Sequence, residues 1–398
     1  MTEQCDTIEQ CDAIEHCDIG IIGGGPVGAA LALALRDSGL DIRVLEARKA
    51  GSASSDARAL ALSCGTRLLL DRLGIWDKLH PVSSIRTIHV SQRHSFGRAV
   101  LRAAELDVPE LGYVLPYPVL QDALDGAMRT SAAKVTYDAN VTGLQGESDE
   151  AVIRYQADGT EHELRTRLAV VADGGKLLAQ QFPPETRDYG QSALIAHVTC
   201  SAPKADTAFE RFTAQGPMAL LPYQDGYELV WTAPHDRAQE MLAWSDAKFL
   251  AELHQHFGDR VGAFTGVGKR SCFPLGLKRA PQQAPMPHTV LLGNAAQTLH
   301  PVAGQGFNMG VRDAWELAQE ILDVAPEKLG TESMLAAYRN SRRTDRETGI
   351  RFTDGLVRLF SNDLPLLTPA RAASLSLLDC LPFAKKFVAK RMMFGANG

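Results

Sequence analysis

The sequence lacks the features that mark membrane-spanning and exported proteins. None of its apolar runs reaches the ~18 residues that a spanning helix needs, and the N-terminus has no basic-then-apolar signal pattern. An excess of basic residues is also missing, because 41 Lys and Arg stand against 47 Asp and Glu, a net charge of −6. That balance gives no general attraction to nucleic acid. We therefore expect a cytoplasmic protein that binds no nucleic acid.

Closely spaced metal ligands are also lacking. Cys5, Cys11 and Cys17 recur every six residues, with His16 beside them, but zinc sites place paired cysteines much closer together. We expect no metal site, and we predict that residues 1–17 form a flexible extension. The seven cysteines are an odd number, which without an export signal favours reduced thiols.

The composition is that of a globular protein, with 45% hydrophobic and 22% charged residues among 398. Residues 18–23 predict an apolar strand, residues 24–28 a tight turn, residues 29–36 a helix and residues 41–47 a second strand. Together they predict one βαβ unit.

The turn of this unit carries a dinucleotide-binding fingerprint. Gly23 permits the tight turn, Gly25 lets a pyrophosphate approach the backbone, and Gly28 lets helix and strand pack closely. The helix N-terminus then offers free N–H groups to the phosphates. Glu46 ends the second strand, where a carboxylate can accept hydrogen bonds from ribose hydroxyls. The pattern alone does not choose between FAD and NAD(P).

A second glycine-rich loop, residues 293–310, favours a flavin. It follows a predicted strand and opens a helix near Phe307, so it is aimed at a ligand. Gly304 and Gly306 let backbone N–H groups crowd against an acceptor, and the positive end of the helix favours the negative charge of a reduced flavin.

The chain as a whole predicts an α/β fold with an inserted sheet. Strands are predicted over residues 167–172 and 288–293, and the block 185–275 predicts a second, mostly antiparallel layer. We expect a discontinuous cofactor-binding domain (18–80, 100–182 and 278–345), a substrate domain (81–99 and 183–277) and a C-terminal helical region (346–398).

Four segments together resemble a known family. They are Gly23–Gly28 with Glu46, Asp56–Ala59, Ala172–Gly174 and Gly293–Gly310. These segments resemble the FAD-dependent aromatic hydroxylases of the para-hydroxybenzoate hydroxylase class. The last segment is similar to that of the ubiquinone-biosynthesis hydroxylases, above all those acting on 2-polyprenyl-6-methoxyphenol. The resemblance covers about residues 18–370 and implies an FAD-binding, Rossmann-like domain.

The resemblance also implies roles for single residues. Arg58 would lie along the cofactor, Gln121 would touch it, and Asp173 would line the groove for FAD and NAD(P)H. Asn294 stands where many relatives carry an Asp that bonds the ribityl chain. The predicted cofactor-binding residues are Gly23, Gly25, Gly28, Glu46, Arg58, Gln121, Asp173, Gly174, Asn294, Gly304, Gly306, Phe307 and Asn308.

The catalytic and substrate-binding predictions are fewer. The resemblance places Pro301 beside the flavin ring, and His300 is a candidate for proton handling, with an ordinary structural histidine equally expected. Candidate substrate walls are Pro222, Tyr223, Phe273 and Pro274. For Phe273, packing in the core is the stronger expectation.

The function that the resemblance implies is hydroxylation of a prenylated phenol, a 2-polyprenyl-6-methoxyphenol, in ubiquinone biosynthesis. The reaction would use NAD(P)H and O2 and proceed through a flavin hydroperoxide. Three alternatives stay open: a sister hydroxylase of the same pathway, a hydroxylase of a small aromatic acid, and a non-catalytic flavoprotein that helps to assemble a complex. An NAD-linked dehydrogenase is disfavoured, because it needs no loop like residues 293–310.

A basic and apolar stretch closes the chain at residues 382–394. Residues 383, 384, 387, 388 and 392 are predicted to share one apolar helical face, with Lys385, Lys386, Lys390 and Arg391 adding positive charge. A helix docked on its own domain is the stronger expectation. The alternative is peripheral contact with the inner membrane surface or with a ubiquinone-biosynthesis complex.

Overall fold

The first of two large sheets contains the predicted βαβ unit. The computed structural model describes residues 14–52, 56, 58–360 and 367–396. The sheet has the order β8-β2-β1-β11-β10-β9, and β18 also pairs with β11. Its strands are β1 (Glu15–Ile22), β2 (Ile42–Glu46), β8 (Lys134–Tyr137), β9 (Asn140–Gly146), β10 (Ala151–Ala157), β11 (Thr160–Val171) and β18 (Thr289–Leu291). The pairs β1–β2, β1–β11, β2–β8 and β11–β18 are parallel, so the glycine turn after β1 lies at the carboxyl edge.

Strand β1 begins three residues before the predicted start at residue 18. His16 and Cys17 pair with Arg165 and Thr166 of β11, so β1 continues for as long as β11 offers a partner. The predicted flexible extension over residues 1–17 is therefore wrong for residues 15–17. Cys5 and Cys11 lie outside the described residues.

The second sheet is the expected, mostly antiparallel layer. Its order is β19-β17-β12-β15-β14-β13-β5-β6, with β16 paired to β12, and only β5 and β13 are parallel. The strands are β5 (Thr87–Gln92), β6 (Arg98–Arg102), β12 (Glu185–Cys200), β13 (Thr207–Thr213), β14 (Gly216–Tyr223), β15 (Gly226–Pro234), β16 (Phe264–Val267), β17 (Ser271–Arg279) and β19 (Gln297–Thr298). Strand β6 ends at Arg102 rather than at the expected boundary of residue 99, and β19 comes from the second glycine-rich loop.

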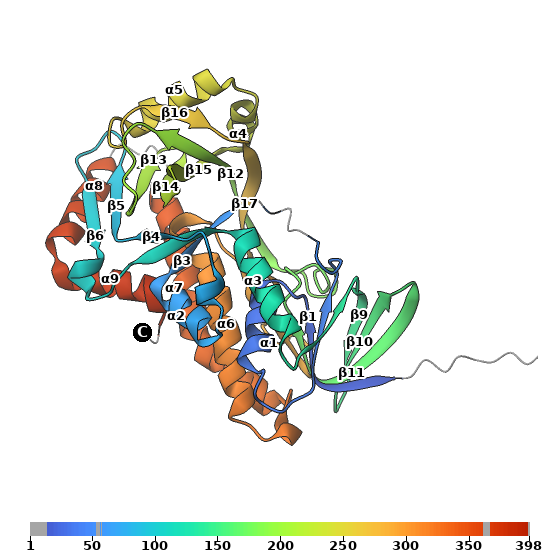
Figure 1. Ribbon diagram of the computed structural model, residues 1–398. Coiled ribbons are helices and arrows are strands. Elements are labelled where there is room, and N and C mark those ends of the chain that lie inside the picture. Colours follow the sequence, from blue (N-terminus) through green and yellow to red (C-terminus); the bar gives the residue numbers. More distant parts are fainter. Residues whose placement is uncertain (1–13, 53–55, 57, 361–366, 397–398) are drawn as a thin grey trace, which may run out of the picture.

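Helices and a small sheet fill the space around these layers. The small sheet is formed by β3 (Ala59–Ser63), β7 (Gly112–Pro116) and β4 (Ser83–Ile85). The helices before the C-terminal region are α1 (Pro26–Ala34), α2 (Cys64–Arg72), α3 (Tyr117–Arg129), α4 (His235–Leu242), α5 (Asp246–Phe257) and α6 (Gln305–Leu322). Figure 1 shows the second sheet at the top, capped by α4 and α5, and the first sheet at the lower right.

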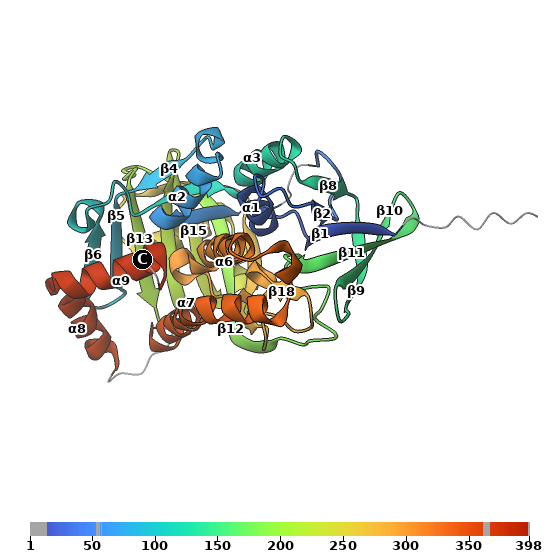
Figure 2. The same cartoon turned by 90° about the horizontal axis from the view of Figure 1, so that it is seen from below.

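Two apolar cores hold the layers together. The larger core joins β1, β2 and β18 to the helices α1, α3 and α6, and the second joins one face of the second sheet to α4 and α5. Figure 2, seen from below, shows α6 side by side with α7 (Glu332–Phe360). The opposite face of the second sheet is thereby turned toward β3, β4 and β7.

The C-terminal helices differ from expectation in two ways. Helix α7 (Glu332–Phe360) crosses the predicted boundary after residue 345 without a break, and α8 (Leu367–Cys380) and α9 (Pro382–Phe394) follow. Helix α9 is docked through Lys385, Ala389 and Met393 and not through the predicted apolar face. Ala389 and Met393 pack beside Leu101, while the Lys385 ammonium donates to the Val100 carbonyl and reaches two carboxylates. Phe383 and Phe387 stay 72% and 65% exposed.

Within the described part of the chain, no helix combines the length and apolarity required to cross a membrane.

Candidate active site

The glycine turn after β1 leaves open space in front of helix α1. Gly23 has a φ of +104°, which favours glycine. A Cβ on Gly28 would lie 2.0 Å from the Gly23 carbonyl oxygen, whereas a Cβ on Gly25 would have no protein atom within 4 Å. No side chain caps the first N–H groups of α1. The turn is therefore closed toward the protein and open toward a ligand, as a pyrophosphate requires.

The predicted partners of this turn hold it in shape. Glu46 is buried and accepts a hydrogen bond of 2.7 Å from the Gly24 N–H, and Arg48 donates to its other oxygen. Arg48 donates twice to that oxygen, so the acceptor site left for a ribose hydroxyl is on Oε2, the oxygen that the Gly24 N–H also contacts. The buried Gln121 amide donates to the Gly24 carbonyl and to Asp125. Gln121 therefore stabilises the turn through its hydrogen bond to Gly24.

Asp173 and Gly174 stand beside this turn, directly after β11. Asp173 accepts hydrogen bonds from the backbone N–H groups of Gly175, Lys176 and Leu177, so its carboxylate shapes the local turn. A Cβ on Gly174 would again meet no protein atom within 4 Å.

The second glycine-rich loop provides another open helix end. Gly304 is the N-cap of α6, and a Cβ on Gly306 would point into open space. Asn308 is fully used inside the protein: its oxygen accepts from the Ser63 N–H and the Thr66 hydroxyl, and its amide donates to the Ala61 and Gly304 carbonyls.

Asn308 therefore ties the start of α6 to β3. Phe307 packs against the larger core, and Asn294 is exposed in a short 3-10 helix. The glycines of both loops fit an extended dinucleotide, because a Cβ on Gly25, Gly174 or Gly306 would meet no protein atom within 4 Å.

His300 and Pro301 begin the turn that leads to Gly304. Pro301 is exposed, but His300 is 1% exposed and packs edge-on against Tyr189. The His300 Nδ1 accepts from the Val302 N–H, and Nε2 has no partner among the described residues. Burial lowers the pKa of His300 to about 4, so the imidazole is neutral at pH 7.

The four candidate substrate walls divide between the two faces of the second sheet. We call the face turned away from α4 and α5 the inner face. Tyr223 and Phe273 lie on it, whereas Pro222 and Pro274 occupy the alternate positions that face the other way. Phe273 is 40% exposed, so the expectation of core packing is wrong.

Arg58 meets the inner face at Phe273. Its guanidinium lies 5.7 Å from the centre of the Phe273 ring and donates to Asp56. The hydrogen bond to Asp56 raises the pKa of Arg58. The structure therefore brings together two predicted site residues from distant parts of the chain. Phe273 belongs to the second sheet, and Arg58 belongs to the segment just before β3.

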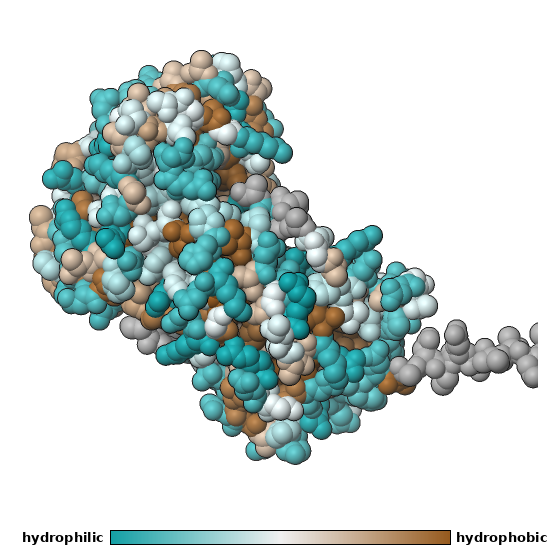
Figure 3. All heavy atoms as spheres, viewed as in Figure 1, coloured by the Kyte–Doolittle hydropathy of each residue, from teal (hydrophilic) through white to brown (hydrophobic). Residues whose placement is uncertain are grey.

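Two carboxyl groups on the inner face were not identified from the sequence. Glu228 of β15 contacts the His197 ring at 3.1 Å, and Glu210 lies on β13. The available signal was an acidic residue in the middle of a predicted strand, next to apolar residues such as Phe209 and Leu229. In the space-filling view, hydrophobic side chains gather in a hollow between the upper and lower parts of the molecule (Figure 3).

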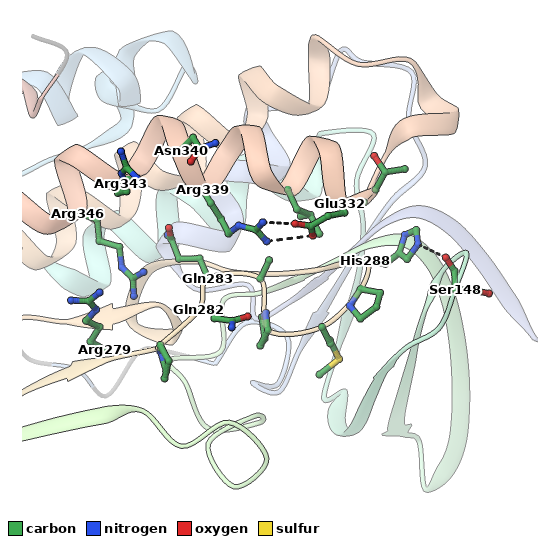
Figure 4. Close-up of a pocket in the computed structure, with 18 of the residues that line it drawn as sticks. Ser148, Arg279, Gln282, Gln283, His288, Glu332, Arg339, Asn340, Arg343 and Arg346 are labelled. Atoms are coloured by element: carbon green, nitrogen blue, oxygen red, sulfur yellow. Dashed lines mark hydrogen bonds and ion pairs between the residues drawn. The ribbon is translucent and has the colours of Figure 1, made fainter.

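A separate open cavity lies between α7 and the segment before β18. Figure 4 shows Arg279, Arg343 and Arg346 lining it, with Arg339 directed to Glu332 and His288 to Ser148. None of the predicted site residues lines this cavity, and we assign the chemistry to the glycine loops and the inner face.

The fold and the two glycine loops define a dinucleotide-binding flavoprotein, and comparison with known proteins agrees. The family described as "FAD binding domain" matches residues 16–353. The chain belongs to this family of FAD-binding proteins, and it is a flavin-dependent hydroxylase, for which NAD(P)H is the typical co-substrate.

Two curated relatives are similar over nearly the whole chain. The chain is 33% identical to the ubiquinone hydroxylase UbiL of Rhodospirillum rubrum, covering 94% of this chain and 88% of that protein. It is 32% identical to the 3-demethoxyubiquinol 3-hydroxylase of Escherichia coli, covering 88% and 91%. Among solved structures, p-nitrophenol 4-monooxygenase from Pseudomonas putida has the same fold, with a TM-score of 0.77, 18% identity and coverage of 96% and 100%.

Proposed function

We propose that this protein hydroxylates a prenylated phenol, a 2-polyprenyl-6-methoxyphenol, in ubiquinone biosynthesis, with NAD(P)H and O2 as co-substrates. The names of the two relatives support the pathway. When bound, FAD would supply the redox chemistry and the activated oxygen. The protein would hold the two ends of FAD with the open N-termini of α1 and α6, and it would hold the phenol against the inner face.

The character of the inner face supports a neutral, apolar substrate. Its partly exposed side chains include a group of apolar residues: Ile195, Ala219, Leu221, Val230 and Phe273. No Lys or Arg occupies an inner-face position in β13, β14 or β15. The same is true of residues 191–199 of β12 and of β17 as far as Leu275.

The charges on this face disfavour the small aromatic acid as substrate. A carboxylate would find no Lys or Arg on the stretches of the inner face named above, the Arg58 guanidinium is already paired with Asp56, and Glu228 already contacts the His197 ring. This charge pattern is the observation that carries the proposal.

The experiment that tests the proposal measures NAD(P)H oxidation by the FAD-loaded full chain under labelled oxygen. We expect 2-prenyl-6-methoxyphenol to stimulate oxidation and to gain one labelled oxygen, and 4-hydroxybenzoate to do neither. Stimulation by 4-hydroxybenzoate alone would replace the proposal with the aromatic-acid alternative. Bound flavin with no stimulation by any phenol would favour the non-catalytic alternative.

We further propose that helix α9 docks on an anionic lipid surface, where a prenylated substrate is found. Phe383 and Phe387 are one turn apart and are largely exposed, and Lys386 and Lys390 are exposed beside them. The opposite side of α9 is docked on the protein, so this face is free in the described structure.

Vesicle co-sedimentation tests the docking proposal. Replacing Phe383 and Phe387 with Ser should reduce binding to vesicles that contain phosphatidylglycerol, and neutral vesicles should bind little of either protein. Replacement of the exposed Leu322 on α6 by Ser is the matched control. Equal binding by the wild-type protein and the double variant would remove the proposal.

A further inference from the structure

Glu210 carries a carboxyl group near the middle of β13. By sheet register it lies between Val90 of β5 and Ala219 of β14. Among the described residues it makes no hydrogen bond and no ion pair. The neighbouring Arg211 points to the other face, where it donates to the His256 carbonyl. Glu210 therefore stands alone among apolar neighbours, an arrangement that costs free energy unless a ligand uses it.

The position of Glu210 joins the second sheet to the second glycine-rich loop. Two residues before it, Ala208 packs in a cluster with Tyr223. Two residues after it, Phe212 packs with Val302, which directly follows Pro301. Because alternate residues of a strand share a face, Glu210 lies on the inner face between these two clusters. Its carboxyl is thus on the side of the sheet that faces the predicted flavin-ring loop.

The Glu210 carboxyl is surrounded by many protein atoms, yet part of the residue is still accessible to solvent. Burial raises the pKa of Glu210 to about 8. Burial is the cause of this rise in pKa, and no charged group contributes to it. Titratable residues do occur on the elements packed nearby: His89 (β5), Tyr223 (β14), Glu228 (β15), His300, Asp354 and Arg358 (α7), and Arg371 (α8).

We propose that Glu210 is the acid–base residue that activates the phenol. The carboxylate of Glu210 accepts the proton from the phenol hydroxyl, and the electron pair of the broken O–H bond stays on the phenol oxygen. The resulting phenolate ring is the better nucleophile toward the oxygen that the flavin chemistry supplies. This role rests on the proposed function, and it assigns a specific residue to a step for which the sequence showed none.

The perturbed acidity makes the transfer feasible. An ordinary glutamate, with a pKa of about 4.3, would take the proton of a phenol of pKa about 10 with an equilibrium constant near ~10⁻⁶. A carboxyl of pKa about 8 improves that constant to ~10⁻², within the range where general-base catalysis is effective.

Other groups on or near this face are already engaged. Glu228 contacts His197. The Nδ1 of His300 accepts from Val302, and the low pKa of that imidazole makes it a poorer base than Glu210.

The test compares wild-type protein with Glu210→Gln, Glu210→Asp and Glu161→Gln, all loaded with FAD. Glu161 is an exposed residue of β11 and is the control for loss of a carboxyl elsewhere. With 2-prenyl-6-methoxyphenol, we expect product formation by the wild type and by Glu161→Gln to rise with pH through an apparent pKa near 8. Glu210→Gln should lose this rise and ~10²-fold or more of the rate, and Glu210→Asp should regain part of both.

A second readout does not depend on turnover. The infrared band of a protonated carboxyl should titrate near pH 8 in the wild type, shift when the phenol binds without NAD(P)H, and be absent from Glu210→Gln. An unchanged pH profile in Glu210→Gln, or a band that ignores the phenol, would overturn the assignment. If wild-type protein forms no product with any phenol, the proposed function fails, and the band shift alone decides whether Glu210 senses a bound phenol.

Discussion

The two glycines of the first loop provide the sharpest test of the cofactor site. Gly25→Ala places a methyl group in open space, because no protein atom lies within 4 Å of that position. Its φ of −64° also suits alanine. We expect the free energy of unfolding of the FAD-free protein to change by less than about 0.5 kcal/mol. The methyl group would instead block the closest approach of the pyrophosphate.

Gly28→Ala should act in the opposite way. Its Cβ would lie 2.0 Å from the Gly23 carbonyl oxygen, so the turn must open by about 1.5 Å to reach an ordinary contact. Overpacking of this kind costs about 1–3 kcal/mol, which should appear as a lower free energy of unfolding even without FAD.

The magnitude for Gly25→Ala follows from the hydrogen bonds that it removes. A hydrogen bond to a charged group contributes about 1.5–3 kcal/mol, so losing one at the pyrophosphate should weaken FAD binding about 10- to 150-fold. Urea denaturation of the FAD-free variants measures stability, and quenching of FAD fluorescence measures affinity. Unchanged affinity in Gly25→Ala would refute the pyrophosphate site at this turn, and unchanged stability in Gly28→Ala would refute the packing argument.

Two further predictions concern buried charges. Arg342→Met should lower the free energy of unfolding by about 3–5 kcal/mol in urea denaturation, because it leaves the fully buried Asp313 carboxylate without its cation, whereas Asp345 keeps Arg312; a change below about 1 kcal/mol would contradict this. The pKa of His300, about 4 when folded and about 6.5 when unfolded, means that the unfolded state binds the extra proton. Stability should therefore be complete above pH 6.5 and fall by about 3 kcal/mol as the pH drops toward 4. Denaturation of His300→Gln across this range should lack that part of the slope, and an equal slope would show that other groups cause it.

Much of the cofactor-binding half could be predicted from the sequence. The strand, turn, helix and strand around Gly23–Gly28 are local, and each residue type there has a local physical reason. The second glycine-rich loop could be predicted equally well. Helix α6 begins at Gln305, two residues before the predicted start near Phe307. Errors occurred where a neighbour far along the chain decides the outcome. Strand β1 begins at Glu15 because β11 provides partners for it.

The inner face could not be predicted in the same way. The residue type of Phe273 predicts a place in the core, but the strand register turns the ring toward Arg58, which lies more than 200 positions earlier in the sequence. For the same reason, α9 docks through Lys385 and Ala389, since Val100 and Glu105 provide partners for the ammonium group. These contacts depend on side chains brought together only by folding.

The sequence alone determined the cofactor class, the α/β architecture and the two loops that hold the dinucleotide, because glycine patterns and strand periodicity act over a few neighbouring residues. Only the tertiary structure decided which face of the second sheet meets those loops, and therefore that Glu210 lies deep among apolar side chains with a pKa raised to about 8. A one-residue change of register would turn that carboxyl to the other face. Burial and acidity depend on everything packed around a group, and no local pattern records them.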